Sequence, residues 1–311
     1  MFSLIIPYHN RRKYLPRTLR SLLNSTLRPR YVYLVDNNST DGSAEFCRRF
    51  ADAHPSYPFI HLSCSQPGAA AARNAALQLV ETEWVFFFDS DDELSSCYLE
   101  NVLYKLRQKP DTDVVASATR MHFPDGRVKV RQVMYNASAA DQILASQLAT
   151  QGMCFRTEFL RRIGGWNEQL FVWNDWELGL RVLLNQPRVS WLKSRAYHHI
   201  YQHPDSLTSS GVCGRLHLLL PALEAARTLL NAHPQLLPVL AARCAILRGR
   251  LKHEKAGTEA GQLAAWMHQS FDKKTTVFLS PFVSFLYLYT RLGGRGAWRI
   301  ARFFLRPFVT R

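Results

Sequence analysis

The stretch Trp84-Val85-Phe86-Phe87-Phe88-Asp89-Ser90-Asp91-Asp92-Glu93 joins a run of bulky apolar residues to a cluster of carboxylates. Five apolar residues in a row predict a strand buried on both faces, as in a parallel sheet. Carboxylates this close repel one another, so a cluster at a strand end usually needs a cation. Oxygen ligands suit Mg²⁺ or Mn²⁺ better than zinc. The sequence therefore predicts a metal site at Asp89, Asp91 and Asp92. The alternative is a solvated acidic turn that caps a helix starting near Ser95.

Strand and helix patterns alternate on both sides of this stretch. Runs of apolar residues predict strands at 2–6, 31–35, 59–62, 84–88, 114–118 and 189–192, and helical spacing predicts helices at 15–23, 69–80 and 98–106. Such alternation is typical of an α/β protein with a doubly wound, mostly parallel sheet. In these sheets ligands bind beyond the carboxyl ends of the strands, which is where the aspartates are expected.

The pattern changes to helices after Ser210. Helices are predicted at 216–230, 236–251 and 261–271, and none of them carries a chemical motif. We therefore expect a first domain at 1–210 and a helical extension at 211–311. Residues 277–289 and 298–306 mix aromatic residues with arginines and few acids. That mixture is typical of a helix in a membrane interface, and a helix docked on the first domain through its aromatic face is the alternative.

The charge of the chain points to an anionic partner. The net charge is +15, and the segment from Arg243 to the end holds thirteen Lys and Arg against three Asp and Glu, a balance of +10. A phosphorylated ligand, an anionic membrane or nucleic acid would each fit such a charge. A nucleic-acid-binding module would interleave its arginines with aromatics on the sheet, whereas here they concentrate in the tail. We expect no nucleic-acid partner.

The cysteines and the apolar runs indicate the compartment. The six cysteines form no C-x-x-C pair, which argues against zinc and for reduced thiols. The chain enters a strand at once without a signal-like segment, and no run reaches the length of a spanning helix. We expect a cytoplasmic protein, held at the inner face of the cytoplasmic membrane if its tail binds lipid.

Five motifs in order resemble those of the family-2 glycosyltransferases, which have the GT-A fold. They are 2–10 (FSLIIPYHN), 35–43 (VDNNSTDGS), 68–77 (GAAAARNAAL), the DSDD cluster, and 163–168 (IGGWNE) with 173–181 (WNDWELGLR). The resemblance covers roughly residues 1–210. It implies a nucleotide-diphosphate sugar as donor, a glycan or lipid-linked acceptor, and Mn²⁺ or Mg²⁺ as cofactor. It implies donor contacts from Pro7, Tyr8, Asp36, Asn37, Gly68, Arg73, Asp89 and Asp91, and metal ligands in Asp91, Asp89, Asp92 and His203.

The residues of the donor motifs have their own chemistry. Asp36 ends a strand, where it can accept hydrogen bonds from a base or ribose or close an Asx-type turn. Many relatives carry a second aspartate where this chain has Asn37, whose amide both donates and accepts. Gly68 allows close backbone approach and opens a helix whose N–H groups point at an anion. Arg73, near that helix start, meets the diphosphate or is a surface arginine.

Asp175 is the predicted catalytic base, at the position where the family places a carboxylate. The alternative is structural, because Asn174 and Glu177 fit a capping box at a helix start. Glu177 is the second choice for the base. The nearby tryptophans 166, 173 and 176 suit the apolar face of a sugar, although core packing is the commoner use of tryptophan. His203 is chosen from the run Tyr197–Ser206, in which relatives often place a histidine against the metal or diphosphate.

The sequence therefore predicts an inverting, metal-dependent glycosyltransferase of cell-surface glycan assembly. A single base without a second carboxylate nucleophile implies inversion. Three other classes fit less well. A sugar-phosphate nucleotidyltransferase begins with a glycine-rich loop, and residues 7–12 contain no glycine. A non-catalytic basic module is disfavoured by the arginine distribution, and a membrane-embedded polysaccharide synthase by the missing spanning helices and Q-x-x-R-W stretch.

Overall fold

The computed structural model describes residues 1–203, 212–271 and 273–305, and of residues 273–280 only the backbone. The chain forms two compact units. The first comprises Met1–Asn136, Leu148–Phe171 and Asn185–His203, and the second comprises Ala137–Gln147, Val172–Leu184 and the described residues beyond 211. Two segments that precede residue 210 therefore group with the C-terminal helices. The predicted boundary at 210–211 itself lies outside the described residues.

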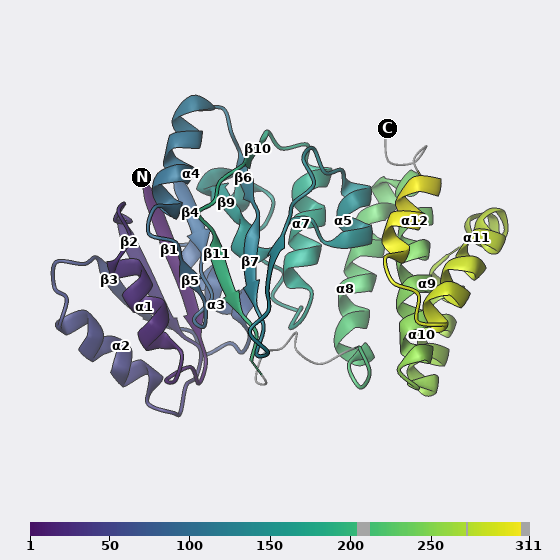
Figure 1. The fold of residues 1–311 in the computed structure, drawn as a ribbon, viewed down its shortest axis with the longest axis horizontal. Helices are drawn as coiled ribbons and strands as arrows, with labels where there is room; N and C mark the ends of the chain where they lie inside the picture. The colour runs from purple at the N-terminus through teal and green to yellow at the C-terminus, as the bar shows by residue number, and fades with distance from the viewer. Residues whose placement is uncertain (204–211, 272, 306–311) are drawn as a thin grey trace. The chain divides into compact units, whose positions relative to one another are not determined.

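The first unit is built on a seven-stranded sheet of order β10-β6-β9-β4-β1-β2-β3 (Figure 1). Only β9 runs antiparallel to its neighbours β4 and β6; the other pairs are parallel. This confirms the predicted α/β class with a mostly parallel sheet. The strands are β1 (Phe2–Tyr8), β2 (Tyr31–Asp36), β3 (Phe59–Ser63), β4 (Trp84–Phe87), β6 (Val114–Ser117), β9 (Met153–Arg156) and β10 (Val189–Leu192).

Helices cover the sheet because its central strands are apolar on both faces. All seven residues of β1 and all four of β4 are buried. Phe86 and Phe88 share one apolar cluster with Leu15 of α1 and Tyr98 of α4, while Phe87, on the opposite face, packs its ring 5.1 Å from that of Trp166. The helices of this unit are α1 (Leu15–Leu23), α2 (Ser43–Asp52), α3 (Ala69–Leu77), α4 (Tyr98–Gln108) and α6 (Thr157–Arg162).

A second sheet of order β5-β11-β7-β8 brings together two parts of the predicted site that are far apart in the sequence. It consists of β5 (Glu93–Leu94), β11 (His198–Tyr201), β7 (Thr119–His122) and β8 (Val128–Arg131). β5 directly follows the aspartate cluster, and its residues pair with His198 and His199 of β11. This pairing brings the histidine-containing segment beside the aspartates, about a hundred residues away in sequence.

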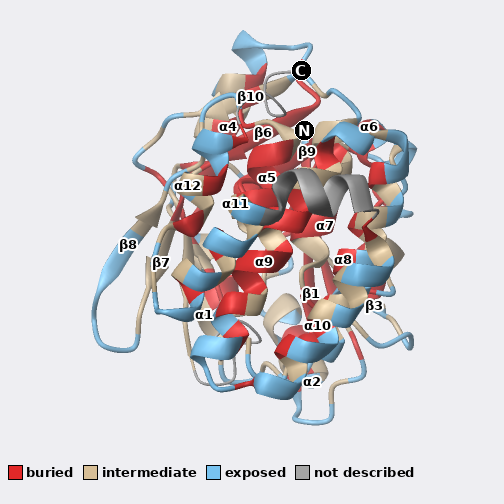
Figure 2. Ribbon diagram, turned by 90° about the vertical axis from the view of Figure 1, so that its right-hand side faces the viewer, coloured by how far each residue is buried: buried red, intermediate tan, exposed pale blue. Residues whose placement is uncertain are grey.

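The second unit is helical. Its helices are α5 (Ala139–Ala145), α7 (Asn174–Leu184), α8 (Leu216–Leu229), α9 (Leu237–His253), α10 (Gly257–Ser270), α11 (Lys273–Arg291) and α12 (Ala297–Phe304), with short 3₁₀ turns at Leu230–Ala232 and Pro234–Leu236. α9 is buried along most of its length (Figure 2). Gly249 lets α11 approach it, because a Cβ there would lie 1.8 Å from the Oγ1 of Thr290. Among the described residues, no helix is long and apolar enough to cross a membrane.

Element bounds differ from the predicted ones mainly at helix ends. β4 ends at Phe87, one residue early, and α3 ends at Leu77 rather than at residue 80. α4 begins at Tyr98, as predicted, and the last predicted helix begins at Gly257 rather than at residue 261. β1 extends to Tyr8 instead of ending at residue 6, so the predicted donor residues Pro7 and Tyr8 lie within the strand.

Candidate functional site

Asp89 lies just beyond β4 and is held by two donors. Nη2 of Arg73 donates to its Oδ1 at 2.7 Å, and Nε2 of Gln151 donates to its Oδ2 at 2.6 Å. Gln151 belongs to the 3₁₀ turn Thr150–Gly152. About a quarter of the Asp89 side chain remains exposed. The carboxylate is thus fixed in orientation while one side stays open to a ligand.

Asp91 pairs with the histidine predicted to lie near it. Its Oδ2 is 2.8 Å from Nε2 of His203, and Nε of Arg11 lies 3.8 Å from the same oxygen. The His203 ring stacks on Tyr14 with centroids 4.3 Å apart, and the Tyr14 hydroxyl lies 3.2 Å from Nδ1. The stacking fixes the imidazole so that Nε2 faces the carboxylate.

Asp92 has a different environment from its two neighbours. It is 2% exposed, and its Oδ2 lies 2.9 Å from Nε2 of the fully buried His198. Burial, and then the charges of Asp89 and Asp91, raise the pKa of Asp92 well above its ordinary value. Burial likewise lowers the pKa of His198 to about 3. Both partners of this contact are buried, so its geometry does not favour the predicted role of Asp92 as a metal ligand.

The residues at Asp91 fit a divalent cation that is shared with a substrate. Among the described residues no three His, Cys, Asp or Glu side chains gather into a metal site. Mg²⁺ usually takes only one or two carboxylates and completes its shell with water and phosphate oxygens. Asp91 and His203, both partly exposed, supply a carboxylate oxygen and an imidazole nitrogen at one point. This donor set suits Mn²⁺ or Mg²⁺ only in company with a ligand such as a diphosphate.

Arg73 is a buried residue of α3 and not a surface arginine. It is 4% exposed, and its guanidinium stacks 4.4 Å from the centroid of the Trp166 ring. Apart from the bond to Asp89, its buried Nε and Nη1 have no acceptor among the described residues. Unpaired buried N–H groups are costly, so they indicate a missing anion or water.

Gly68 shapes the start of α3. Its φ of +117° and ψ of 142° are open to glycine but strained for other residues. Among the described residues α3 has no side-chain cap, so its first N–H groups are available to an anion. Trp166 of the IGGWNE segment is in the core beneath Arg73 and is not a sugar-binding surface. Gly68 and Arg73 thus lie on one helix start, as the sequence predicts.

Asn37 holds the loop before α3 through both the nitrogen and the oxygen of its amide. It is 6% exposed, and Nδ2 donates to the carbonyls of Cys64 and Gln66 at 2.9 and 2.7 Å. Its Oδ1 accepts from the N–H of Gly68 at 2.8 Å. Asp36 accepts from the N–H of Ser39 at 3.1 Å, an Asx-type turn that leaves the carboxylate half-buried. The amide of Asn37 therefore supports the loop before α3. The sequence predicted only a role in donor binding for this residue.

Pro7 and Tyr8 end β1 with buried side chains. Tyr8 is 4% exposed and belongs to the apolar cluster beneath the sheet, where burial and then Cys47 raise the pKa of its hydroxyl. Its carbonyl accepts from the N–H of Asn37. The loop that follows is tied to the loop after β2, since the His9 ring bonds the Asn37 carbonyl at 2.7 Å. These two predicted donor residues therefore support the loops from within the core.

Asp175 lies at the start of α7 in the second unit. It is half-buried, and its Oδ1 accepts from the N–H of Trp176 at 2.8 Å. α7 begins at Asn174, and the buried Glu177 pairs through both oxygens with Arg181 at 2.6 and 2.8 Å. That pairing also leaves Glu177 unsuited as a base. Asp175 is the carboxylate of this segment that remains partly exposed.

The other two tryptophans of this region differ in exposure. Trp176 is 1% exposed and donates from Nε1 to the carbonyl of Gln142 at 3.0 Å, which makes it a core residue. Trp173 is half-buried, has a φ of +56° and lies under the guanidinium of Arg243 at 4.8 Å. Of the predicted aromatic cluster, only Trp173 keeps an accessible ring.

Comparison with known proteins identifies the family. The model of glycosyl transferase family 2 matches residues 3–163, just over half of the 311 residues. The chain belongs to this family. Its fold is similar to that of TarS residues 1–349 from S. aureus in complex with UDP-GlcNAc, with a TM-score of 0.72 and 21% identity over 98% of this chain and 91% of that one. The mannosyltransferase PcManGT from Pyrobaculum calidifontis, solved with GDP-Man and Mn²⁺, gives a TM-score of 0.58 and 19% identity over 100% and 88% of the two chains.

Curated relatives of this family 2 chain are longer than the part that matches. A cholesterol galactosyltransferase from Borreliella burgdorferi is 26% identical over 67% of this chain and 62% of its own length. The minor teichoic acid biosynthesis protein GgaB from Bacillus subtilis is 31% identical over 40% of this chain and 14% of its own. The chain therefore aligns with about three fifths of the first relative and a small part of the second.

Two residues that contact the aspartate cluster could not be assigned from the sequence. Gln151 gives no signal, because it comes from a short turn and meets Asp89 only through the fold. His198 was within the predicted histidine run. Nothing in the sequence of that run shows that His198 is the buried partner of Asp92 and His203 the partly exposed partner of Asp91. The alternation along β11 makes that distinction, since it points His198 into the core.

Proposed function

We propose that this family 2 chain transfers a sugar from a nucleotide-diphosphate donor to a hydroxyl acceptor, with inversion and with a divalent cation. The observation that carries the proposal is the arrangement at the end of β4. There the unpaired N–H groups of Arg73, the start of α3 and the Asp91–His203 pair gather in the first unit. Such a set fits an anion that brings its own cation.

The residues divide the chemistry between donor and acceptor. The diphosphate would accept hydrogen bonds from Arg73 and from the first turn of α3, while Asp89 keeps Arg73 in place. Mn²⁺ or Mg²⁺ held by Asp91, His203 and the open side of Asp89 would neutralise the charge that develops on the leaving diphosphate. Asp175 would take the proton of the acceptor hydroxyl while the oxygen of that hydroxyl attacks the anomeric carbon. A single base implies inversion.

The names of relatives support the substrate class. TarS has been solved with UDP-GlcNAc and with UDP, and PcManGT with GDP-Man, so a nucleotide-diphosphate sugar is the proposed donor. GgaB and a teichoic acid poly(glycerol phosphate) polymerase from Staphylococcus epidermidis, 30% identical over 58% of this chain, belong to cell-surface polymer synthesis. We propose a glycan or lipid-linked acceptor from that kind of assembly, on the cytoplasmic side of the membrane.

The proposal includes reversible attachment to an anionic membrane surface through α11 and α12. Five side chains of this region are strongly exposed apolar groups, namely Phe285, Leu288, Leu292, Phe303 and Phe304. Residues 281–305 contain four arginines and no acidic residue. The opposite faces are packed, since Leu286, Ala301 and Leu305 are buried. One face of the tail therefore packs within the second unit, and the exposed face is the one that we propose to meet lipid.

Donor binding is tested by thermal unfolding with a panel of nucleoside diphosphates, with and without Mn²⁺. A ligand at a hundred times its dissociation constant adds about 2.7 kcal/mol to the stability of the folded state. We expect one base to stabilise the chain only with the metal, and Asp91→Asn to abolish that gain. Asp125→Asn, at an exposed turn, is the matched control. Full transfer activity in excess chelator would contradict the metal-dependent part.

The base is tested with the same material. Asp175→Asn is expected to keep the nucleotide-dependent stabilisation and to lower turnover by about two to four orders of magnitude, the usual worth of a general base. Glu177→Gln breaks the pair with Arg181 and should act on stability instead. Unchanged turnover in Asp175→Asn would remove this residue from the mechanism while leaving donor binding untouched.

A further inference from the structure

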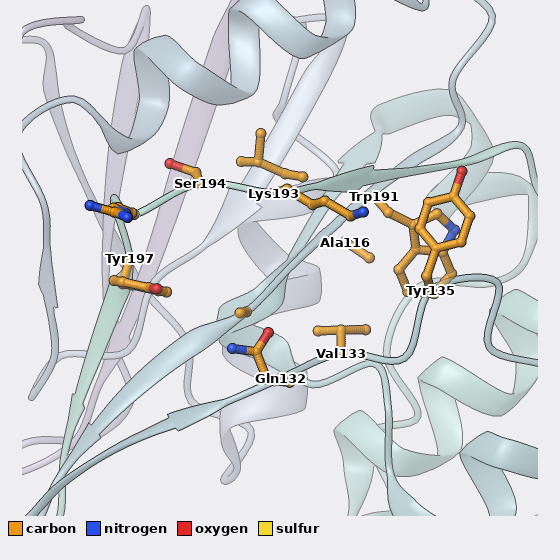
Figure 3. A pocket seen from close by; sticks show the side chains of 11 residues that line it. Ala116, Gln132, Val133, Tyr135, Trp191, Lys193, Ser194 and Tyr197 are labelled. Carbon is orange, nitrogen blue, oxygen red and sulfur yellow. The ribbon is translucent and has the colours of Figure 1, made fainter.

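A pocket of about 420 Å³ lies at the ends of β6 and β10 in the first unit, apart from the aspartate cluster. Figure 3 shows its walls, which come from the ends of these strands and from the segment after β8. None of its eleven lining residues is acidic. Three of them are aromatic and two are cations, namely Tyr135, Trp191, Tyr197, Lys193 and Arg195. The proposed transfer reaction has not used any of them.

One aromatic ring of this pocket is strongly exposed and the other two are half-buried. Tyr135 is 65% exposed, and its ring centroid lies 6.0 Å from that of the half-buried Trp191 at an angle of 50°. The Lys193 ammonium is 5.5 Å from the Tyr135 ring and points toward this pair (Figure 3). The faces of these rings suit the C–H face of a sugar or polyol.

In the part of the chain that the structure describes, the two cations of the pocket have no carboxylate partner. Within the described ranges neither Lys193 nor Arg195 forms an ion pair, and both are exposed. An ammonium and a guanidinium beside aromatic faces match a ligand that carries both hydroxyl-bearing carbons and a phosphate or carboxylate. The Ser194 hydroxyl and the Gln132 amide also line the pocket, and both are neutral groups that can form hydrogen bonds with such a ligand.

Strand register places this pocket within reach of the donor site. Cys154 of β9 pairs with Phe86 of β4 and with Val115 of β6, so β6 is two strands from the strand that ends at the aspartates. On β10, Trp191 pairs with Ala116 of β6. At 4.7–4.9 Å per strand, the pocket is about 10–14 Å across the sheet from β4. A few linked sugar or polyol units span that distance.

We propose that this pocket binds an anionic unit of the acceptor chain, that is, a sugar or polyol that carries a phosphate or a carboxylate. The proposal rests on the proposed transfer function and adds the chemical class of the acceptor. The pocket would hold a unit some way along the chain while the terminal hydroxyl reaches the donor. Contacts remote from the reacting atoms position a substrate for transfer.

The test is calorimetric titration of the full chain with three oligomers. Glycerol-phosphate oligomers carry phosphate, oligogalacturonate carries carboxylates, and maltohexaose is neutral. We expect one of the two anionic oligomers to bind, and maltohexaose to bind at least about tenfold more weakly, a difference of about 1.4 kcal/mol. Which anionic oligomer binds assigns the phosphate or the carboxylate. Equal binding of maltohexaose would overturn the anionic part of the proposal.

A double variant locates the binding. Tyr135→Ala with Lys193→Gln changes two exposed side chains of the pocket, and Tyr104→Ala with Lys105→Gln makes the same exchange on α4 as a control. The pocket variant is expected to weaken oligomer binding about tenfold or more, with the control unchanged. Wild-type binding in the pocket variant, or no binding of either anionic oligomer to the natural chain, would overturn the proposal. Nucleotide-dependent stabilisation is measured in the same samples, so a failure of donor binding is seen separately.

Discussion

Three neighbouring aspartates take three different states because each side chain meets different partners. Asp89 is fixed by Arg73 and Gln151, Asp91 faces His203, and Asp92 is buried against His198. Sequence spacing located the cluster correctly at the end of β4. It gave no means to tell the buried Asp92 from the two partly exposed aspartates, because that difference depends on which side chains arrive from residues 198–203 and from the 3₁₀ turn at residue 150.

A single substitution at Asn37 tests whether its amide holds the loop before α3. Asn37→Asp replaces an amide that donates to two carbonyls with a carboxylate that repels them. Since the residue is buried, we expect a loss of about 2–4 kcal/mol in the free energy of unfolding. The exposed Asn38→Asp loses one donor bond, to Ser65, and should cost less than about 1 kcal/mol. Urea unfolding followed by tryptophan fluorescence compares the two. Equal midpoints would show that the Asn37 amide does not hold the loop.

The structure gives the Asn37 amide a role that the resemblance did not suggest. An aspartate is usual at this position in relatives, so the sequence suggested an altered contact with the nucleobase. The structure places the amide against the carbonyls of Cys64 and Gln66 instead. Local spacing could not reveal this, since the partner segment is about thirty residues away and the bonds exist only once β2 and β3 pair.

At the scale of elements, the long apolar strands and the periodic helices were predictable, and the short antiparallel pieces were not. β1, β2 and β4 are apolar runs, whereas β9 is four residues of mixed character between a turn and α6. β5 is only two residues long. Such strands are selected by their neighbours in the sheet and not by their own sequence. The second sheet, which unites the aspartates with β11, was therefore absent from the prediction.

The start of α3 carries a prediction of its own. The new Cβ of Gly68→Ala would lie 3.5 Å from the Phe171 ring, an ordinary van der Waals contact, so the cost of the change is one of backbone conformation. We expect about 2–3 kcal/mol, because φ of +117° with ψ of 142° is nearly restricted to glycine. Gly42→Ala, at φ of +83° and ψ of 8° before α2, enters the milder left-handed region and should cost about 1–2 kcal/mol. Thermal midpoints rank the two, and a smaller effect at Gly68 would contradict the strain argument.

The excess charge of the whole molecule is distributed unevenly. The sequence predicted the basic tail and its helices, and the structure adds which side chains of α11 and α12 are exposed. The side chains of residues 277–280 and the end of the tail from residue 306 lie outside the described residues. The sequence could not separate the packed side chains of the tail from the exposed ones. The packed ones are Leu286, Thr290, Ala297, Ala301 and Leu305, and none of these is aromatic. Packing against α9, through contacts such as Gly249 with Thr290, separates the two groups.

The full chain is predicted to attach to anionic membranes through the charges and exposed rings of α11 and α12. Each arginine near an anionic surface is worth about 1 kcal/mol and is screened over about 8 Å at physiological salt, whereas a buried Phe adds about 1.5–3 kcal/mol that salt does not remove. The full chain should therefore sediment with phosphatidylglycerol vesicles at low salt and partly dissociate at high salt. Phosphatidylcholine vesicles should bind it weakly.

A pair of phenylalanines separates attachment from a purely structural role of the tail. Phe303 and Phe304 are 68% and 60% exposed, so Phe303→Ser with Phe304→Ser should leave the thermal midpoint nearly unchanged. The same variant is expected to lower vesicle binding at least about tenfold, because two apolar side chains no longer enter the interface. Leu79→Ser with Tyr104→Ser, at exposed sites of the first unit, is the control. If the natural chain ignores phosphatidylglycerol at low salt, the exposed face of α11 and α12 does not bind lipid. If the variant unfolds, these rings stabilise the second unit instead.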